Sequence, residues 1–301
     1  MRRIRLLTAI TLVLGLCAVL PSAGWSAPKK EKPKKKKQIC ITFNELPAAQ
    51  SFSGVDREAI TYLILEALRK HHVKAAGFVV AGQIEDSWDI LGEWLNAGHL
   101  LGSMTYSNQD FNELSIEQQI KEIERGQEAM EAMLKGFGQK RRYFRYPYLH
   151  YGLTIEARKQ TTWYLRDHHI TIVPATVVPE DYLYNLSLDK LGKRPDSASW
   201  VELRDEYLNH VFDELDRCEA LAVELVHRPI RQILLLRANR LNAVFLDDML
   251  TALEDAGYTF VSLPTALKDK VYSLPEAYYG PKGLGYLDMI KESDPDLLPA
   301  Q

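Results

Sequence analysis

The stretch that decides the fold is "ICITFNELPAAQ", residues 39–50. Its first half has the length and composition of a buried strand, with an apolar run formed by Ile39, Cys40, Ile41 and Phe43. A carboxamide and a carboxylate, Asn44 and Glu45, follow at the point where a buried strand should reach solvent. The stretch therefore predicts a core strand that presents two polar side chains at its carboxyl end.

Further segments along the chain have the same apolar, β-branched character: residues 75–80, 99–104, 143–146, 170–177, 233–236 and 258–262. Helical segments separate them, and one of these opens with Ser115 and Gln118 in the pattern of a capping box. Strands that alternate with helices predict a parallel sheet. Because the crossings are close to regular, we expect a distorted (β/α)7 barrel and not an open doubly wound sheet.

Two regions interrupt this regular pattern. Residues 183–226 form an insertion, predicted mostly as one long helix over 199–226, and a turn-rich tail follows Leu274. The sequence has no glycine-rich phosphate loop and no GxSxG motif, which argues against nucleotide binding and against the common serine hydrolase architecture. Cys40 and Cys218 lie far apart in the sequence, so we expect two buried thiols and not a disulfide framework.

The first residues, 1–27, have the layout of a secretory signal peptide. Arginines precede an apolar run over residues 6–20, and small residues follow that run. The alternative is an uncleaved membrane anchor, but the run is shorter than the roughly 20 residues that span a bilayer. We therefore expect a secreted or periplasmic protein.

Residues 28–37, "PKKEKPKKKK", form a lysine-rich linker too polar to fold by itself. Residues 1–37 carry ten basic and one acidic side chain, so the formal charge of −3 for the chain leaves −12 for residues 38–301. The linker is either a solvated connection or a tether to anionic lipids or glycans. Nucleic acid is not an expected partner outside the cytoplasm. The barrel domain is expected over 38–290 and a C-terminal tail over 291–301.

Polar residues follow several of the expected strands, and in barrels of this kind the carboxyl ends of the strands build the active site. The segments that carry them are "ITFNELP", "GHLLGSMTYSNQDF", "YFRYPYLHYG", "VVPEDY" and "LLLRANRLNA". In this order they resemble the five motifs of the polysaccharide deacetylases with a NodB-homology domain, over residues 38–290. The resemblance implies a distorted (β/α)7 barrel of the glycoside hydrolase/deacetylase type. It also implies a metal-dependent deacetylase that acts on acetylated glycans and uses a divalent metal such as zinc.

The resemblance also implies which residues the motifs should hold, and most of these are substituted. The family has two aspartates, a catalytic base and a metal ligand, where this chain has Asn44 and Glu45. The two metal-binding histidines of the family correspond to Met104 and Asn108, and its general-acid histidine corresponds to Arg237. The scaffold is thus similar, while the residues that carry the chemistry differ.

The family's aspartate that orients the general acid corresponds to Val178. Only three motif positions keep the family residue: Arg145, Pro147 and Asp181.

Chemistry shows how much these substitutions matter. A hydrolytic metal site needs three firm protein ligands and an open position for water. Glu45 can still bind a metal, but a methionine thioether at 104 and an amide carbonyl at 108 are poor ligands for zinc-type ions. Asn44 cannot take a proton from water, and Arg237 stays protonated and cannot serve as an acid. We therefore expect no bound metal and no metal-dependent deacetylase activity.

Without a metal, two carboxylates would remain uncompensated in a partly desolvated site. We expect arginines to form ion pairs with them: Glu45 with Arg237 or Arg145, and Asp181 with the other arginine.

The interpretation that follows is a homologue of the deacetylases that binds a polysaccharide, such as a cell-wall glycan, or a protein partner. We expect Tyr148, His150 and Tyr182 to contact substrate. They belong to a larger aromatic set of which at least half is expected to be packing: Tyr106, Tyr146, Tyr148, Tyr151, Tyr182 and Tyr184. The alternative is an active carbohydrate deacetylase or esterase with a rebuilt site, in which His150 and either Glu180 or Asp181 form an acid/base pair.

Overall fold

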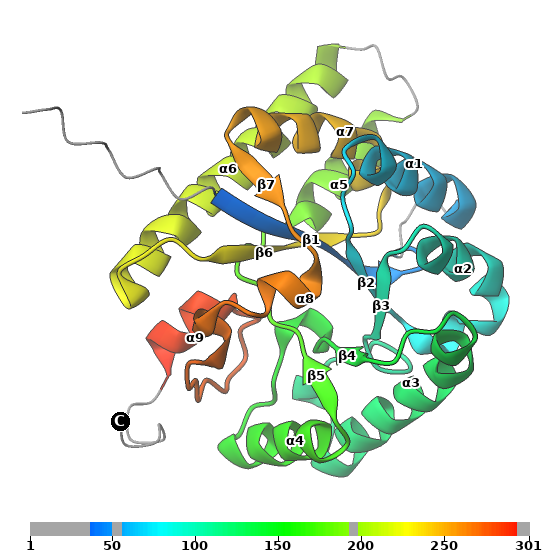
Figure 1. Ribbon diagram of the computed structural model, residues 1–301, viewed down its shortest axis with the longest axis vertical. Helices are drawn as coiled ribbons and strands as arrows, with labels where there is room; N and C mark the ends of the chain where they lie inside the picture. Colours follow the sequence, from blue (N-terminus) through cyan, green and yellow to red (C-terminus); the bar gives the residue numbers. More distant parts are fainter. Residues whose placement is uncertain (1–36, 50–55, 193–197, 294–301) are drawn as a thin grey trace, which may run out of the picture. The chain divides into compact units, whose positions relative to one another are not determined.

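The computed structural model describes residues 37–49, 56–192 and 198–293 (Figure 1). The expected signal peptide, the linker apart from Lys37, and residues 294–301 of the expected tail lie outside the described residues. The described strands are β1 (Lys37–Leu46), β2 (Ala76–Val79), β3 (Leu100–Ser103), β4 (Arg142–Phe144), β5 (Ile170–Ile172), β6 (Arg231–Arg237) and β7 (Tyr258–Phe260).

The strands form one parallel sheet in the order β5-β4-β3-β2-β1-β6, and β7 also pairs with β1. Strand β6 follows β1 along most of its length, from Gln38 opposite Arg231 to Asn44 opposite Arg237. Strand β7 pairs only with the first residues of β1. The expected parallel (β/α)7 architecture is confirmed, and the register places position 44 beside position 237.

The barrel is distorted where β5 should meet β6. Strand β5 ends at Ile172, earlier than the predicted 170–177, and Pro174 follows, which has no backbone N–H to donate to a ladder. Beyond the proline, the backbone N–H of Val177 donates to the carbonyl of Ile233 at 3.1 Å, and Leu235 donates back to Val177 at 3.0 Å. One isolated bridge therefore links the two edges of the sheet.

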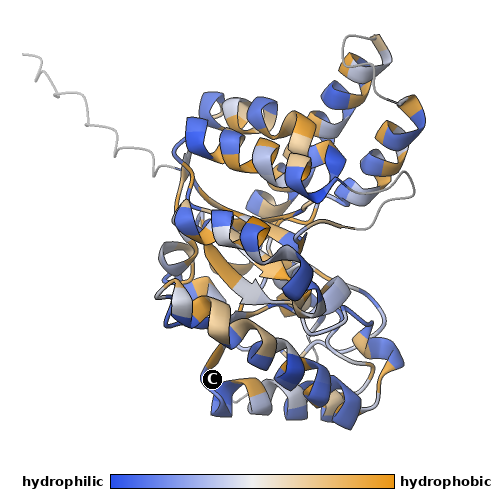
Figure 2. Ribbon diagram, turned by 90° about the vertical axis from the view of Figure 1, so that its right-hand side faces the viewer, coloured by the Kyte–Doolittle hydropathy of each residue, from blue (hydrophilic) through white to orange (hydrophobic). Residues whose placement is uncertain are grey.

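Alternation along β1 decides which residues face the barrel interior. Ile39, Ile41 and Phe43 belong to the core between the sheet and the helices. Cys40 faces the other way, into a cluster with Phe78, Met104 and Ile233, which fills the barrel. The strands are mainly hydrophobic while the helices alternate between hydrophobic and hydrophilic residues, as Figure 2 shows. Thr42 and Asn44, two and four residues beyond Cys40, share its inward side.

The helices flank the strands (Figure 1). Their bounds are α1 (Arg57–Lys70), α2 (Trp88–Asn96), α3 (Ile116–Gly136), α4 (Ile155–Asp167), α5 (Asp181–Leu191), α6 (Ala198–Val226), α7 (Arg240–Asp255), α8 (Leu263–Ala266) and α9 (Tyr286–Glu292). Short 3₁₀ helices cover Ala81–Gln83, Glu85–Ser87, Phe111–Glu113, Pro147–Leu149 and Lys270–Ser273. The capping box predicted at the start of α3 is present, with Ser115 and Gln118 bonded reciprocally.

The insertion and the tail hold more structure than the sequence indicated. The long helix predicted over 199–226 is α6, but the insertion also contains α5. The region after Leu274, expected to be rich in turns, contains α9, and this part of the prediction was wrong. Helix α9 is short, and it is held by tertiary packing because its side chains Leu287 and Met289 are buried.

Cys40 and Cys218 are free and buried, which confirms the expected pair of thiols. In the part of the chain that the structure describes, no helix has both the length and the apolar character needed to cross a bilayer.

Candidate active site

A cavity of about 630 Å³ opens at the carboxyl ends of the strands. Its size lies within the range of small-molecule sites. Of the residues singled out in the sequence, those that line it are Asn44, Glu45, Met104, Tyr148, His150, Val178, Glu180, Tyr182 and Arg237. The structure therefore gathers residues from five separate motifs at one site, which we call the mouth.

The backbone around the mouth is held in strained conformations. Several non-glycine residues at the strand ends have the left-handed φ that such residues rarely adopt: Glu45 (64°), Thr105 (63°), Asn108 (58°), Tyr148 (52°), Leu149 (56°) and Glu180 (47°). Strain of this kind persists only where the surrounding structure fixes it, and it is typical of ligand sites.

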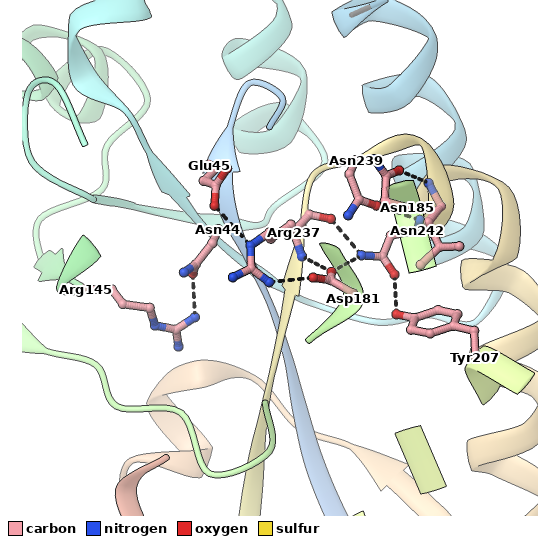
Figure 3. A network of polar contacts seen from close by, with 10 residues as sticks. Asn44, Glu45, Arg145, Asp181, Asn185, Tyr207, Arg237, Asn239 and Asn242 are labelled. Atoms are coloured by element: carbon pink, nitrogen blue, oxygen red, sulfur yellow. Dashed lines mark hydrogen bonds and ion pairs between the residues drawn. The ribbon is translucent and has the colours of Figure 1, made fainter. Parts of the chain in front are cut away.

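Arg237, at the end of β6, lies between two carboxylates (Figure 3). Its Nε donates to Glu45 Oε1 at 3.1 Å, and its Nη1 donates to Asp181 Oδ1 at 2.6 Å. Its backbone N–H also donates to Asp181 Oδ2 at 2.6 Å. One guanidinium thus joins the end of β1, the start of α5 and the end of β6.

Burial and charge act in opposite directions on this group. Burial lowers the pKa of Arg237, but Asp181 and Glu45 outweigh that effect and leave its pKa raised. Burial raises the pKa of Glu45, Arg237 opposes the rise, and the neighbouring Asp181 adds to it. The shared guanidinium therefore does not fully compensate Glu45, because Asp181 takes part of its charge.

Behind the mouth, Asp181 is held by a second layer of hydrogen bonds (Figure 3). Its Oδ2 accepts from Asn242 Nδ2 at 2.5 Å, and the Oδ1 of Asn242 accepts from the hydroxyl of Tyr207 at 2.7 Å. The side chains of Asp181 and Tyr207 are fully buried. Long helix α6, which carries Tyr207, therefore helps to fix Asp181.

Arg145, which follows β4, is fully buried and contacts neutral acceptors. Its Nη1 donates to Asn44 Oδ1 at 2.9 Å and to Thr42 Oγ1 at 2.8 Å. Its remaining bonds go to the carbonyls of Val173 and Pro174. Burial lowers the pKa of Arg145 to about 9.

The expected division of the two carboxylates between two arginines is therefore half right. Arg237 pairs with Glu45, which was one of the two predicted alternatives, but it binds Asp181 as well. Arg145 points into the barrel interior, where β1 offers it a hydroxyl and an amide.

The positions that correspond to the metal ligands do not fit a metal. Met104 is buried in the cluster that fills the barrel, and Glu45 is engaged by Arg237. Asn108 donates its backbone N–H to Thr105, while its side-chain oxygen is buried without a partner. Within the described residues, no three His, Cys, Asp or Glu side chains gather in a way that would hold a metal ion.

His150 forms a different pair from the one predicted. Its Nδ1 lies 2.7 Å from Asp110 Oδ1, whereas Asp181 is occupied by Arg237 and Glu180 is exposed at the start of α5. Asp110 lies several residues beyond the end of β3, so its approach to His150 depends on tertiary structure. It was therefore missed in the sequence.

The aromatic residues separate into wall and core. Tyr148 and Tyr182 line the mouth and are 49% and 41% exposed. Tyr146 and Tyr151 are buried in the core, and Tyr184 packs against Tyr207. The expectation that at least half of this set is packing agrees with their burial.

Residues that the sequence reasoning missed include Thr42, Asn185, Tyr207 and Asn242, whereas Asn239 lies in the motif segment "LLLRANRLNA". Asn239 is the N-cap of α7, and an asparagine before an amphipathic run is a signal that the sequence offered. The others act through contacts between distant segments, for which the sequence carried no local signal.

Comparisons with known proteins point to the same family as the motifs. The profile described as "Polysaccharide deacetylase" matches residues 31–164. A 30.6 kDa protein of Geobacillus stearothermophilus is 23% identical over 244 residues, which cover 81% of this chain and 76% of that protein. The peptidoglycan-N-acetylglucosamine deacetylase PgdA of Listeria monocytogenes is 27% identical over 111 residues, which cover 37% of this chain and 22% of PgdA.

Among solved structures, a CE4 family pseudoenzyme from Bacillus anthracis superimposes with a TM-score of 0.54 at 20% identity, covering 78% of this chain and 66% of that one. This likeness establishes the fold. Together with the motifs in the mouth, the comparisons support a divergent member of the polysaccharide deacetylase family.

Proposed function

We propose that this protein binds a cell-wall glycan in its mouth and lacks metal-dependent deacetylase activity. The observation that carries the proposal is Arg237, whose guanidinium bonds both Glu45 and Asp181. A fixed cation thus already forms an ion pair with Glu45, the one carboxylate that corresponds to a metal ligand. Asn44, at the position of the catalytic base, is an amide that accepts a hydrogen bond from Arg145 and has no useful basicity.

Binding is supported by the parts of the mouth that remain. The cavity is open, Tyr148 and Tyr182 expose ring surface in its wall, and the strained backbone of the strand ends is retained. Aromatic faces suit the apolar faces of sugar rings. Cell-wall glycan is the ligand class we infer, because PgdA, which is 27% identical to this chain over 111 residues, is a peptidoglycan-N-acetylglucosamine deacetylase.

The test combines metal analysis with acetate release. The purified protein is dialysed, titrated with zinc and incubated with N-acetylated chito-oligosaccharides and peptidoglycan fragments. We expect neither stoichiometric zinc nor released acetate. A fourfold variant with Asn44→Asp, Met104→His, Asn108→His and Arg237→His is the matched control for metal binding on the same scaffold. A mutant of the Bacillus anthracis pseudoenzyme has restored enzymatic activity, which gives this design a precedent. Acetate release by the unmodified protein would overturn the proposal.

A second candidate function is supported by the His150–Asp110 pair. A carboxylate on Nδ1 orients the imidazole and leaves Nε2 as a base, the arrangement used for metal-free proton transfer. The candidate is an esterase or amidase with a rebuilt site. It predicts turnover that survives chelators and is lost in His150→Gln.

We further propose that the protein is secreted or periplasmic and that residues 28–37 add affinity for anionic surfaces, at about 1 kcal/mol per lysine held near the surface. Removal of residues 28–37 should abolish salt-sensitive binding to anionic vesicles or sacculi. Unchanged binding would make this segment a linker only.

A further inference from the structure

We propose that the mouth selects glycans whose hexosamines carry a free amine, in preference to the N-acetylated form. The inference rests on the proposed glycan binding and specifies its ligand class. It follows from the charge around the cavity, the polar groups in its wall and its aromatic faces.

The mouth has an excess of negative charge. Glu45 and Glu180 line the cavity together with Arg237, and buried Asp181 bonds Arg237 from behind. Three carboxylates thus stand against two guanidiniums, Arg237 and the buried Arg145 that bonds Asn44 of the same wall, which leaves an excess of one negative charge. Glu180 is exposed at the start of α5, and its carboxylate has no ion-pair partner among the residues that the structure describes. His150 and Asp110 form their own pair at the rim and do not remove this excess.

The arginine that replaces the metal does not neutralise the site. Burial is the largest cause of the raised pKa of Glu45, and the neighbouring Asp181 adds to the rise while Arg237 opposes it. A cationic ligand would supply the missing charge. A neutral acetamide would not.

The wall also offers a donor that an acidic surface alone would lack. Asn239 is 3% exposed and lines the cavity. Its Oδ1 accepts from the backbone N–H of Asn242, while its Nδ2 is buried and has no partner among the described residues. A buried donor without a hydrogen bond is unfavourable unless a ligand oxygen accepts from it. A sugar hydroxyl meets that need.

Two aromatic side chains complete the site. Tyr148 and Tyr182 expose about half or less of their surface on the cavity wall. The guanidinium carbon of Arg237 lies over the ring of Tyr182, 5.0 Å from its centroid. This cation–π contact shows that the ring stabilises a nearby positive charge. An amino sugar matches all three features: its ammonium group suits the carboxylates, a hydroxyl oxygen can accept from Asn239 Nδ2, and its ring faces suit the aromatic side chains.

The experiment compares two probes by calorimetry on the full chain at a pH where the sugar amine is protonated. One probe is the tetramer of N-acetylglucosamine, and the other is its fully de-N-acetylated counterpart. We expect the amino tetramer to bind at least tenfold more tightly, with an affinity that falls as salt rises, because screening weakens attraction at the open mouth. A linear polyamine of equal charge, which lacks sugar rings, should bind at least tenfold more weakly than the amino tetramer.

Variants locate the effect in the mouth. Glu180→Gln removes a carboxylate that has no structural partner, and it should weaken binding of the amino tetramer several-fold while leaving the acetylated tetramer unchanged. Glu131→Gln, at an exposed position on α3, is the matched control and should change neither affinity.

The outcomes separate the two proposals. Tighter or equal binding of the acetylated tetramer would overturn the amine preference and leave glycan binding intact. Equal binding of the polyamine and the amino tetramer would reduce the effect to general attraction by an acidic protein and would overturn it too. If neither tetramer binds to the folded protein, the proposed function fails together with this inference.

Discussion

Arg237 and Arg145 are cations of the same barrel, and their surroundings differ in charge. Arg237 ends β6 and bonds two carboxylates, Glu45 and Asp181, at the edge of the mouth. Arg145 follows β4, is more deeply buried, and bonds an amide, a hydroxyl and two backbone carbonyls. Burial lowers the pKa of Arg145, whereas the carboxylates raise the pKa of Arg237.

The difference shows that a residue with the family identity can lack a charged partner while a substituted residue binds two. Arg145 keeps the family identity, but the aspartate that the resemblance places at position 44 is Asn44 here, so Arg145 has lost a charged neighbour. Arg237 is a substitution, yet it has gained both remaining carboxylates. Electrostatic balance in the mouth therefore depends on the new arginine.

The largest effect is expected for Arg237→Met. The change leaves Asp181, whose side chain is fully buried, without its ion-pair partner and should cost about 3 kcal/mol or more in the free energy of unfolding. Urea denaturation at neutral pH measures it. Arg145→Met is the matched comparison: it leaves no carboxylate unpaired and should cost clearly less, although Arg145 is more buried.

A double-mutant cycle sharpens this prediction. Asp181→Asn should recover more of the stability lost in Arg237→Met than Glu45→Gln does, because Glu45 keeps 19% of its side-chain surface exposed and Asp181 keeps none. Equal losses for the two arginine variants would show that carboxylate partners do not govern the difference between the two regions.

A smaller effect of opposite sign is expected for Asn44→Asp. The new carboxylate would accept the 2.9 Å hydrogen bond that Arg145 now donates to the amide and should stabilise the fold by about 1–2 kcal/mol. Arg145 would hold the pKa of this carboxyl below its unfolded value, near 3.9. The gain should therefore be present above about pH 4 and be lost as pH falls through the lower folded value. Chemical denaturation of both proteins from acid to neutral pH measures it. A gain independent of pH would contradict the ion pair.

The smallest effect concerns the pH dependence of Glu45. Burial raises its pKa above the ordinary 4.5, so its contribution to stability is complete below that value and is lost as pH rises through the folded pKa. Glu45→Gln should therefore gain on the wild-type protein as pH rises through this window, by about 1 kcal/mol or less. Paired unfolding curves from pH 4 to pH 7 detect the change. A difference that moves in the other direction would mean that Arg237 holds Glu45 charged after all.

Much of the fold was predictable because its signals are local. The apolar run of β1, the capping box of α3 and the long amphipathic helix α6 each appear in consecutive residues. Strand β5 was predicted too long because the apolar pattern continues through Pro174, although the proline cannot join the ladder. Helix α9 was missed because its stability comes from packing.

The sequence predicted which residues lie at the site better than it predicted which of them bind one another. The motif positions named the residues of the mouth, but the sequence left open which arginine pairs with Glu45 and which with Asp181. The partners of Arg145 and His150 were wrong or missed, because several acceptors at the strand ends lay within reach of each donor in any arrangement the sequence allowed.

The sequence by itself determined the order of strands and helices and the inward alternation of β1. It also placed Asn44, Arg237, Met104 and Asn108 where the resemblance implies a base, an acid and two histidine ligands. Each of these is fixed by residue identity or by short-range periodicity. The tertiary structure decided which charges meet. Glu45 and Arg237 are 192 residues apart in the chain, and only the β1–β6 register, with Asn44 opposite Arg237, brings their side chains within 3.1 Å. Because Coulomb attraction and hydrogen bonding fall steeply with distance and desolvation, that register determines which arginine takes the carboxylates.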